Sequence, residues 1–482
     1  MTLNTTIGRV EKTTFRRWCG AFAVTMALVF SVGADQAFGA EKKDGKKKGA
    51  LLEEVLPYKS DEDLPTRTPP IVEIGPKFLG RGEIDEGFEI FTGAVWQPAL
   101  WVFGDYRTSI NYVSDADSND LLEWANSLDL FANLQLTPTE RILLGINPLR
   151  NGGAATGHVW KPDATDGEQN HFNTRITTFF AEGQLGELFP TFDATKGGLL
   201  DYGFSIGRQL IFFQEGIMLN DTIDAVGINR DTIQYPGVID TRFTVLFGWD
   251  EVGRDDNVED EEAYLFGIFT ETDFRKSTVN VDLAYVLSED PDGGSGKGDG
   301  IYAGIAATQR IGHVNTSFRI NGSWATGDSN EAVSDGYVLM AETSITPFGT
   351  HDVAYLNAFA GFDHYSSAAR SATAGGPMGR VGILFASPNL GRIGSPLSNR
   401  ADEVVGGALG YQMFFNGDRT QIIAELGARK AMESSGSDQF GIGARFQQAI
   451  GKRHVLQFDA FAAARENESD IIGGRAEWLV RF

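Results

Sequence analysis

The stretch Gly474-Arg475-Ala476-Glu477-Trp478-Leu479-Val480-Arg481-Phe482 ends the chain and alternates strictly between two faces. One face carries Trp478 and Phe482, and the other carries Arg475, Glu477 and Arg481. A period of two is typical of a β-strand with one apolar and one polar face. A single strand proves little, so the fold prediction depends on whether the pattern recurs.

The alternation does recur after Trp101, in segments of about ten residues, which is the length that a tilted strand needs to cross a bilayer. Clear examples lie at residues 102–112, 128–136, 243–249, 314–324 and 440–447. Beyond the N-terminal segment, no stretch approaches 18 consecutive apolar residues. The sequence therefore predicts membrane-spanning strands and excludes helical spans.

Short turns and long polar segments alternate along the chain. Turns are expected at 138–139, 312–313, 347–349, 416–417 and 451–452, and loops at 151–171, 250–262, 289–300, 325–335, 433–438 and 466–470. Short turns on one side and long loops on the other are typical of outer-membrane barrels. The alternation holds only if Tyr365 to Asp402 is one long extracellular loop, without a wall strand at Val381–Phe385.

These patterns predict an all-β fold, a transmembrane antiparallel β-barrel of about 18 strands in the outer membrane. The count is 16 if the weakest strand, Ile223–Ile228, does not form. A sheet in hydrocarbon must close on itself, and at this size side chains no longer fill the interior, so a water-filled channel is expected. The expected partners are outer-membrane lipid, lipopolysaccharide and, through the terminal strand ending in Phe482, the barrel assembly machinery.

The N-terminus predicts an exported protein. A basic front is followed by an apolar run from Trp18 to about Gly33, as in a secretory signal peptide, with cleavage after Ala34 or near Ala40. The expected organisation is a signal peptide at 1–40, a periplasmic leader at 41–97 that either is flexible or plugs the pore, and a barrel at 98–482. The sole cysteine, Cys19, lies in the signal segment, so no disulfide is expected in the mature chain.

The charge balance excludes nucleic acid as a partner. Lysine and arginine number 41 against 65 aspartate and glutamate residues, for a formal net charge of −24. The 58 glycines, 34 phenylalanines and 8 tryptophans suit strands, turns and interfacial aromatic belts.

The predicted pore lining carries arginine rather than lysine. The basic candidates are Arg107, Arg242, Arg319, Arg445 and Arg475, and acidic candidates share their face: Asp105, Asp129, Glu425, Asp459 and Glu477. Arginine pairs with carboxylates and sugar oxygens, which would suit anionic or hydroxyl-rich solutes. Alternatively, the arginines and acids pair with one another and brace the wall. Arginines without an acidic partner would favour transport.

Catalysis and metal binding are not expected. The six histidines lie at turns and loops, and none sits on a strand beside a credible nucleophile. His158 and His171 share a loop, but their spacing matches no strong metal-site pattern. The sequence predicts no enzyme, no catalytic residue, no metal and no cofactor.

One segment resembles a known family. Gly207-Arg208-Gln209, followed by Asn220-Asp221 and Asp224-Ala225-Val226, is similar to a segment of alginate-export-type outer-membrane proteins. The likeness covers about 20 positions and implies a monomeric 18-stranded barrel with an arginine-rich lumen for an anionic exopolysaccharide. It also implies that Arg208 lies at or near the pore, whereas strand parity puts it on the opposite side, so a bulge or a rim position is required.

Three functions remain open from the sequence. The first is a channel of the alginate-export type, for an exopolysaccharide or for smaller polar or anionic solutes. The second is a general diffusion porin, which would be a trimer with a balanced lining. The third is a structural or adhesive barrel whose acidic loops carry the function.

Overall fold

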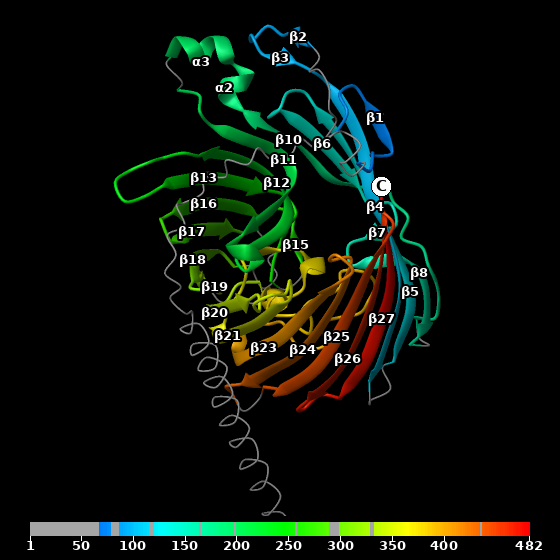
Figure 1. Cartoon of the computed structure of the whole chain (residues 1–482). Coiled ribbons are helices and arrows are strands. Elements are labelled where there is room, and N and C mark those ends of the chain that lie inside the picture. The colour runs from blue at the N-terminus through cyan, green and yellow to red at the C-terminus, as the bar shows by residue number, and fades with distance from the viewer. Residues whose placement is uncertain are drawn as a thin grey trace, which may run out of the picture. The chain divides into compact units, whose positions relative to one another are not determined.

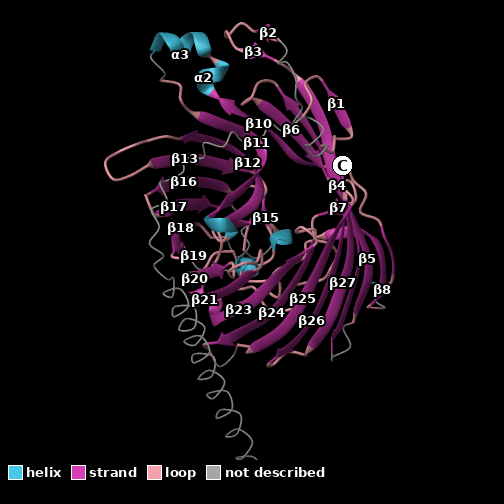
Figure 2. Ribbon diagram, viewed as in Figure 1, coloured by secondary structure: helices cyan, strands magenta, loops and turns pink. Residues whose placement is uncertain are grey.

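The structure, a computed structural model, describes residues 67–78, 86–115, 120–162, 165–196, 199–255, 258–288, 298–327, 332–433 and 436–482. The predicted signal peptide and residues 41–66 of the leader lie outside this range. The described residues form a closed antiparallel barrel of 18 strands (Figures 1 and 2). Its wall strands are β4 (Ala99–Asp115), β5 (Leu121–Gln135), β6 (Arg141–Ile146), β10 (Ile176–Gln184), β11 (Gly203–Phe213), β12 (Leu219–Arg230), β13 (Asp240–Trp249), β16 (Tyr264–Asp273), β17 (Ser277–Leu287), β18 (Gly300–Ile311), β19 (Val314–Ala325), β20 (Gly336–Ile345), β21 (Val353–His364), β23 (Asp402–Phe415), β24 (Thr420–Ala431), β25 (Gln439–Ile450), β26 (His454–Arg465) and β27 (Ile471–Arg481).

The last strand closes the barrel against the first. β27 pairs with β4 from Ile471 opposite Asp115 to Arg481 opposite Asp105. The terminal Phe482 extends this ladder, since its N–H and carbonyl both bond with the backbone of Gly104. The closed ladder leaves no edge of this sheet unpaired at the seam, as a sheet in hydrocarbon requires.

Alternation along β27 separates an apolar outer face from a polar inner face. Ile472 and Trp478 are 64% and 44% exposed, whereas Arg475 and Glu477 are only 6% and 7% exposed. The other wall strands repeat the pattern, so the outer face is the one that suits lipid. No helix among the described residues is long and apolar enough to cross a membrane.

The strand count confirms the larger of the two predicted numbers. The segment at 223–228 lies within β12, which pairs with β11 and β13. Residues 381–385 form no wall strand, because β21 pairs directly with β23 and His364 lies opposite Asp402. The long connection between these two strands is therefore one loop, as predicted.

Two connections differ from the sequence prediction. Part of the expected loop at 151–171 is the strand β8 (Ala154–Lys161), which pairs with residues 122–126 of β5. The connection between β10 and β11, on the side of the short turns, carries two short helices, α2 (Leu185–Leu188) and α3 (Pro190–Lys196). Alternation alone gave no signal for either feature.

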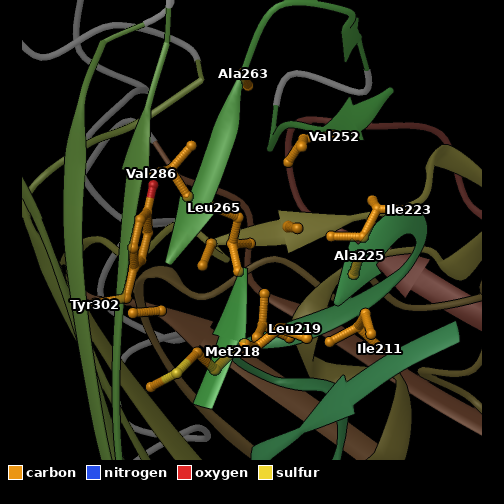
Figure 3. Close-up of a cluster of buried hydrophobic side chains, with 14 of the residues drawn as sticks. Ile211, Met218, Leu219, Ile223, Ala225, Val252, Ala263, Leu265, Val286 and Tyr302 are labelled. Atoms are coloured by element: carbon orange, nitrogen blue, oxygen red, sulfur yellow. The ribbon is translucent and has the colours of Figure 1, made fainter. Parts of the chain in front are cut away.

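The tip of β11 and β12 leaves the wall and enters the barrel; residues 209–223 are named the inner hairpin. β10 pairs with β11 only as far as Arg208, and β13 pairs with β12 only as far as Asp224. Beyond that level Met218 and Leu219 are fully buried beside Leu265 and Tyr302 of the wall (Figure 3). Each such buried side chain contributes roughly 1.5–3 kcal/mol of apolar stabilisation.

The connection between β21 and β23 also folds into the barrel; residues 365–401 are named the inner loop (Figure 1). It contains β22 (Ala369–Arg370), which pairs in parallel with Leu219–Asn220 of the inner hairpin. Its apolar side chains, including Met378, Leu384 and Phe385, pack with inward-facing Val338 and Phe359 in a second core.

The described part of the leader lies against the barrel. β1 (Val72–Ile74) pairs with residues 100–102 of β4, just beyond the end of β27. β2 (Phe88–Glu89) and β3 (Val95–Trp96) form a separate hairpin close to α3, since a Cβ on Gly93 would lie 2.3 Å from Thr191 Oγ1. The described part of the leader therefore contacts β4 and α3.

Candidate functional site: the lumen

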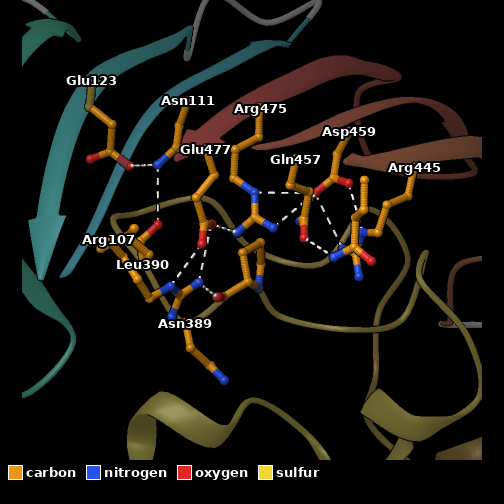
Figure 4. Close-up of polar contacts among 12 residues, drawn as sticks. Arg107, Asn111, Glu123, Asn389, Leu390, Arg445, Gln457, Asp459, Arg475 and Glu477 are labelled. Carbon is orange, nitrogen blue, oxygen red and sulfur yellow. Dashed lines mark hydrogen bonds and ion pairs between the residues drawn. The ribbon is translucent and has the colours of Figure 1, made fainter. Parts of the chain in front are cut away.

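The inner loop is fixed to β4 and β5 by hydrogen bonds to its backbone. Asn111 Nδ2 donates to the Leu390 carbonyl at 3.1 Å and to Glu123 Oε1 at 2.8 Å (Figure 4). The backbone N–H of Arg392 donates to the same Glu123 oxygen at 2.5 Å. The two side chains come from neighbouring strands, and the contacts place residues 390–392 of the loop next to the wall.

Another wall carboxylate holds the 383–384 stretch of the loop. Glu425 on β24 accepts the backbone N–H groups of Ile383 and Leu384, both at 2.9 Å. Its Oε2 also accepts the hydroxyl of Tyr355 on β21. Buried backbone donors need a partner, so Glu425 allows an irregular segment to lie inside the barrel.

Four neighbouring strands carry a row of alternating charges, named the charge ladder (Figure 4). Arg107 on β4 contacts Glu477 at 2.8 Å, and Glu477 contacts Arg475 at 3.0 Å on β27. Arg475 contacts Asp459 on β26 at 2.9 Å, and Asp459 contacts Arg445 on β25 at 2.7 Å. Each of these five predicted residues therefore has an opposite charge beside it.

The ladder also contacts the inner loop. Arg107 Nη2 donates to the carbonyl oxygen of Pro388 at 3.2 Å. Two further acidic candidates, Asp105 and Asp129, lie directly opposite each other on β4 and β5, one inward position from Arg107. Asn147 Nδ2 donates to Asp129 at 2.8 Å, and no ion pair joins either carboxylate to a basic residue of the described chain.

The remaining arginines on the predicted inner face are paired too. Arg242 on β13 contacts Asp231 at 2.5 Å. Arg319 on β19 forms a close ion pair with Glu342 and lies 3.8 Å from Glu215 of the inner hairpin. These ion pairs agree with the alternative interpretation, in which the inward arginines pair with acidic residues and brace the wall.

Arg208 is the last residue of β11 that pairs with β10, at the level where the inner hairpin leaves the wall, and neither ladder of β11 has a bulge there. Gly207 adopts a φ of +117°, a conformation that side chains rarely adopt. Arg208 and Arg175 both form ion pairs with Glu251. Glu251 and its neighbour Asp250 have φ values of 50° and 61°, so the backbone of this loop is itself unusual.

Sequence reasoning predicted the loop but missed that it folds into the lumen and that it is the most positively charged segment there. In a chain with a net charge of −24, this 365–401 segment has no acidic residue and no lysine, but four arginines: Arg370, Arg380, Arg392 and Arg400. The signal was present in the composition. It was overlooked because the candidates were sought on strands.

The four loop arginines differ in their partners. Arg380 pairs with Glu215, and Arg400 pairs with Asp255 at 2.8 Å. Arg392 instead donates to neutral oxygens, Thr165 Oγ1 at 3.0 Å among them, and it has no acidic partner among the described residues. Arg150, next to the loop, likewise donates to a carbonyl oxygen, that of Asn389 at 3.0 Å.

Arg370 joins the inner loop to the inner hairpin. It donates to the backbone carbonyl of Gly216 in the hairpin and to Ser367 Oγ and the Gly375 carbonyl in the loop. Burial lowers the pKa of Arg370 to about 10, so the guanidinium remains charged at neutral pH. The two inserted segments therefore form one connected structure in the lumen.

Comparison with known proteins identifies the fold. No family model and no curated protein matches the sequence. Solved structures do match: OpdK of Pseudomonas aeruginosa, determined with vanillate, has 13% sequence identity and a TM-score of 0.53 over 79% of this chain and 98% of its own. The chain has the fold of these outer-membrane proteins.

Two further structures from Pseudomonas aeruginosa agree. OccK2 (OpdF) has 11% identity and a TM-score of 0.54 over 80% of this chain and 97% of its own. OccK11 (OpdR) has 10% identity and a TM-score of 0.52 over 80% and 96%. The identities are low, so the likeness concerns the barrel and not the residues of the lumen.

Proposed function

We propose that the chain is an outer-membrane channel that passes small polar solutes, with a preference for those that carry negative charge. The observation that carries the proposal is the inner loop, a segment with four arginines and no acid that wall side chains hold inside the barrel. A positive segment in a narrow, low-dielectric passage favours anions.

Arg392 and Arg150 are the residues proposed to contact a passing anion. Both donate to neutral oxygens and neither forms a direct ion pair among the described residues, although Asp129 and Asp105 lie near enough to Arg150 to interact with its charge. The charge ladder has a different role in this proposal. Its arginines are paired along the wall and position the loop, and Arg107 does so directly.

The narrower form of the proposal is export of an anionic exopolysaccharide such as alginate. It draws on the resemblance around Arg208 and on the positive inner loop. A polymer would have to thread past the inner loop, which Glu123 on β5 and Glu425 on β24 anchor to the wall. Passage of single small solutes needs no such rearrangement, and we favour it for that reason.

A monomer is the proposed assembly, which draws on the resemblance around Arg208. A general diffusion porin is the second candidate, and the extensive pairing of luminal charges favours it.

The proposal includes two partners besides the solute. We propose that the barrel assembly machinery recognises the strand ending in Phe482 and that the barrel contacts lipopolysaccharide. We also propose that the protein has no enzymatic activity.

Reversal potential in a potassium chloride gradient across a planar bilayer tests the preference for anions. The purified protein should be anion-selective, and Arg392→Ala should reduce that selectivity because it removes a charge without an acidic partner. The matched control is Arg419→Ala in an exposed turn, where the guanidinium donates to the Ala449 carbonyl. Cation selectivity of the unmodified protein would overturn the preference and leave the general porin.

A further inference from the structure

The lumen contains a pocket that the proposed anion path does not use. It is a cavity of about 270 Å³ between the inner hairpin and the inward faces of β13, β16, β17, β18 and β19. Gln214 and Glu215 cover it from the hairpin, and Asp282 and Arg319 reach it from the wall. The volume lies just below the usual range of small-molecule sites, which begins at roughly 300 Å³.

Strand register explains why a hollow forms here. Ala306 on β18 lies opposite Asn280 on β17 and opposite Arg319 on β19. The next inward position on β18 is Gly304, opposite Asp282. The side chains of Gln214 and Met218 lie over Gly304, so the hollow forms over Ala306, a small residue between the longer side chains of Asn280 and Arg319.

Asp282 is a buried carboxylate without a counter-ion. It is 4% exposed, and it accepts hydrogen bonds from Gln214 Nε2 at 2.7 Å and from the Thr270 N–H at 3.0 Å. Among the described residues, no lysine, arginine or histidine forms an ion pair with it. Burying a charge without a partner is costly, so a cation at this position would be strongly favoured.

Two further atoms in the pocket lack partners. Gln214 Oε1 and Arg319 Nε are buried without a hydrogen bond, and both residues are 5% exposed. The charged residues of the lining sum to one excess negative charge, from Glu215, Glu271 and Asp282 against Arg242 and Arg319. The pocket thus lacks one positive charge, a donor for Gln214 and an acceptor for Arg319.

We propose that this pocket binds a small organic solute with one ammonium group and a neighbouring hydroxyl group. The ammonium group lies against Asp282 and Gln214 Oε1, and a hydroxyl oxygen accepts from Arg319 Nε. Amino sugars and amino alcohols have this chemistry. The inference rests on the proposed channel function only in that the solute must reach the lumen.

Three solutes of equal size separate charge from shape: glucosamine, glucose and glucuronate. The detergent-solubilised protein should be stabilised against thermal unfolding by millimolar glucosamine, as a ligand of the folded state does, and not by the same concentration of glucose. In planar bilayers, glucosamine should reduce the single-channel current at a lower concentration than glucose. The thermal readout does not require a conducting channel.

Asp282→Asn is the decisive variant, because it removes the charge and keeps the shape. It should fold, since the amide oxygen can still accept from Thr270 and the unpartnered Gln214 oxygen can turn to accept from the new amide. The affinity for glucosamine should fall roughly tenfold, the value of one hydrogen bond to a charged group. Asp418→Asn, in an exposed turn, is the matched control and should leave it unchanged.

Ala306→Leu fills the hollow without changing any charge, and it should also abolish the glucosamine effect. Glucuronate tests the anion path, so its reduction of the single-channel current should persist in Asp282→Asn and weaken in Arg392→Ala. The inference is overturned if glucose stabilises the protein as well as glucosamine does, or if Asp282→Asn binds glucosamine normally. Loss of anion selectivity alone would overturn the proposed function and not this site.

Discussion

Single side chains in the lumen determine whether the inserted segments stay in place. Glu425 on β24 satisfies two backbone N–H groups of the inner loop, and Glu123 on β5 satisfies a third. An irregular segment cannot satisfy its own backbone as a helix or a sheet does, so the wall must supply acceptors. Carboxylates are well suited because hydrogen bonds to charged groups are the stronger ones.

Glu425→Ala should therefore destabilise the protein by roughly 2–4 kcal/mol, since it leaves two buried donors without an acceptor. Glu425→Gln keeps one acceptor oxygen and should cost less. Equilibrium unfolding in urea measures both values. Equal stability of the two variants would contradict the assigned role of the carboxylate.

The charge ladder predicts which of its arginines contributes more to the stability of the folded protein. The side chain of Arg475 is 3% exposed and contacts both Asp459 and Glu477, whereas the side chain of Arg445 is 22% exposed and contacts Asp459 alone. Arg475→Ala should cost about 3 kcal/mol, as expected for a buried pair, and Arg445→Ala about 1 kcal/mol. The same urea experiment tests the order, and a larger loss for Arg445→Ala would contradict it.

Among the elements, the inner hairpin depends on one backbone position. Gly207 lies where β11 stops pairing with β10, and a Cβ there would lie 2.3 Å from the Phe179 carbonyl oxygen. Its φ of +117° lets the strand turn away from the wall. The hairpin can then place Gln214 and Glu215 over the pocket and Gly216 against Arg370.

Gly207→Ala should destabilise the barrel by roughly 2–3 kcal/mol, because it adds a steric clash to the cost of a positive φ. Gly237→Ala is the matched control: its φ is +91°, but nothing lies within 4 Å of the new Cβ. That variant should cost about 1 kcal/mol. Equal losses, measured as shifts in thermal unfolding, would show that contact with Phe179 is unimportant.

The sequence predicted elements of the wall well and the inserted segments poorly. Alternation revealed β27 and required residues 365–402 to be a loop, but a period of two says nothing of where a loop folds. The place of that loop depends on contacts between residues far apart in the chain, such as Asn111 with Leu390. Parity and resemblance disagreed at Arg208 and required a bulge or a rim position there, and the structure has no bulge, because β11 keeps a continuous register with both of its neighbours.

The candidate residues on strands illustrate the same limit. Parity put Arg475 and Glu477 on one face, and the structure has both side chains buried away from the apolar outer face. Their ion pairs could not be predicted, since partners such as Asp459 and Arg107 depend on strand order and register. Asp282 was not singled out, because its lack of a counter-ion is visible only once its neighbours are known.

The whole molecule combines an acidic chain with a basic interior segment. The barrel closes through β27, presents an apolar outer face, and holds a loop with four arginines across its lumen. Glu123 and Glu425 of the wall anchor that loop, and Glu215 of the inner hairpin and Asp255 balance part of its charge. The central claim is that the inner loop narrows the channel and sets its preference for anions.

Removal of the inner loop tests this claim most directly. His364 lies opposite Asp402, so a two-residue Asn-Gly turn can replace residues 365–401 and join β21 to β23 without stretching either strand. We predict that the shortened protein has a single-channel conductance several-fold above that of the full protein and little selectivity for anions. An unchanged conductance with an unchanged reversal potential would contradict the account.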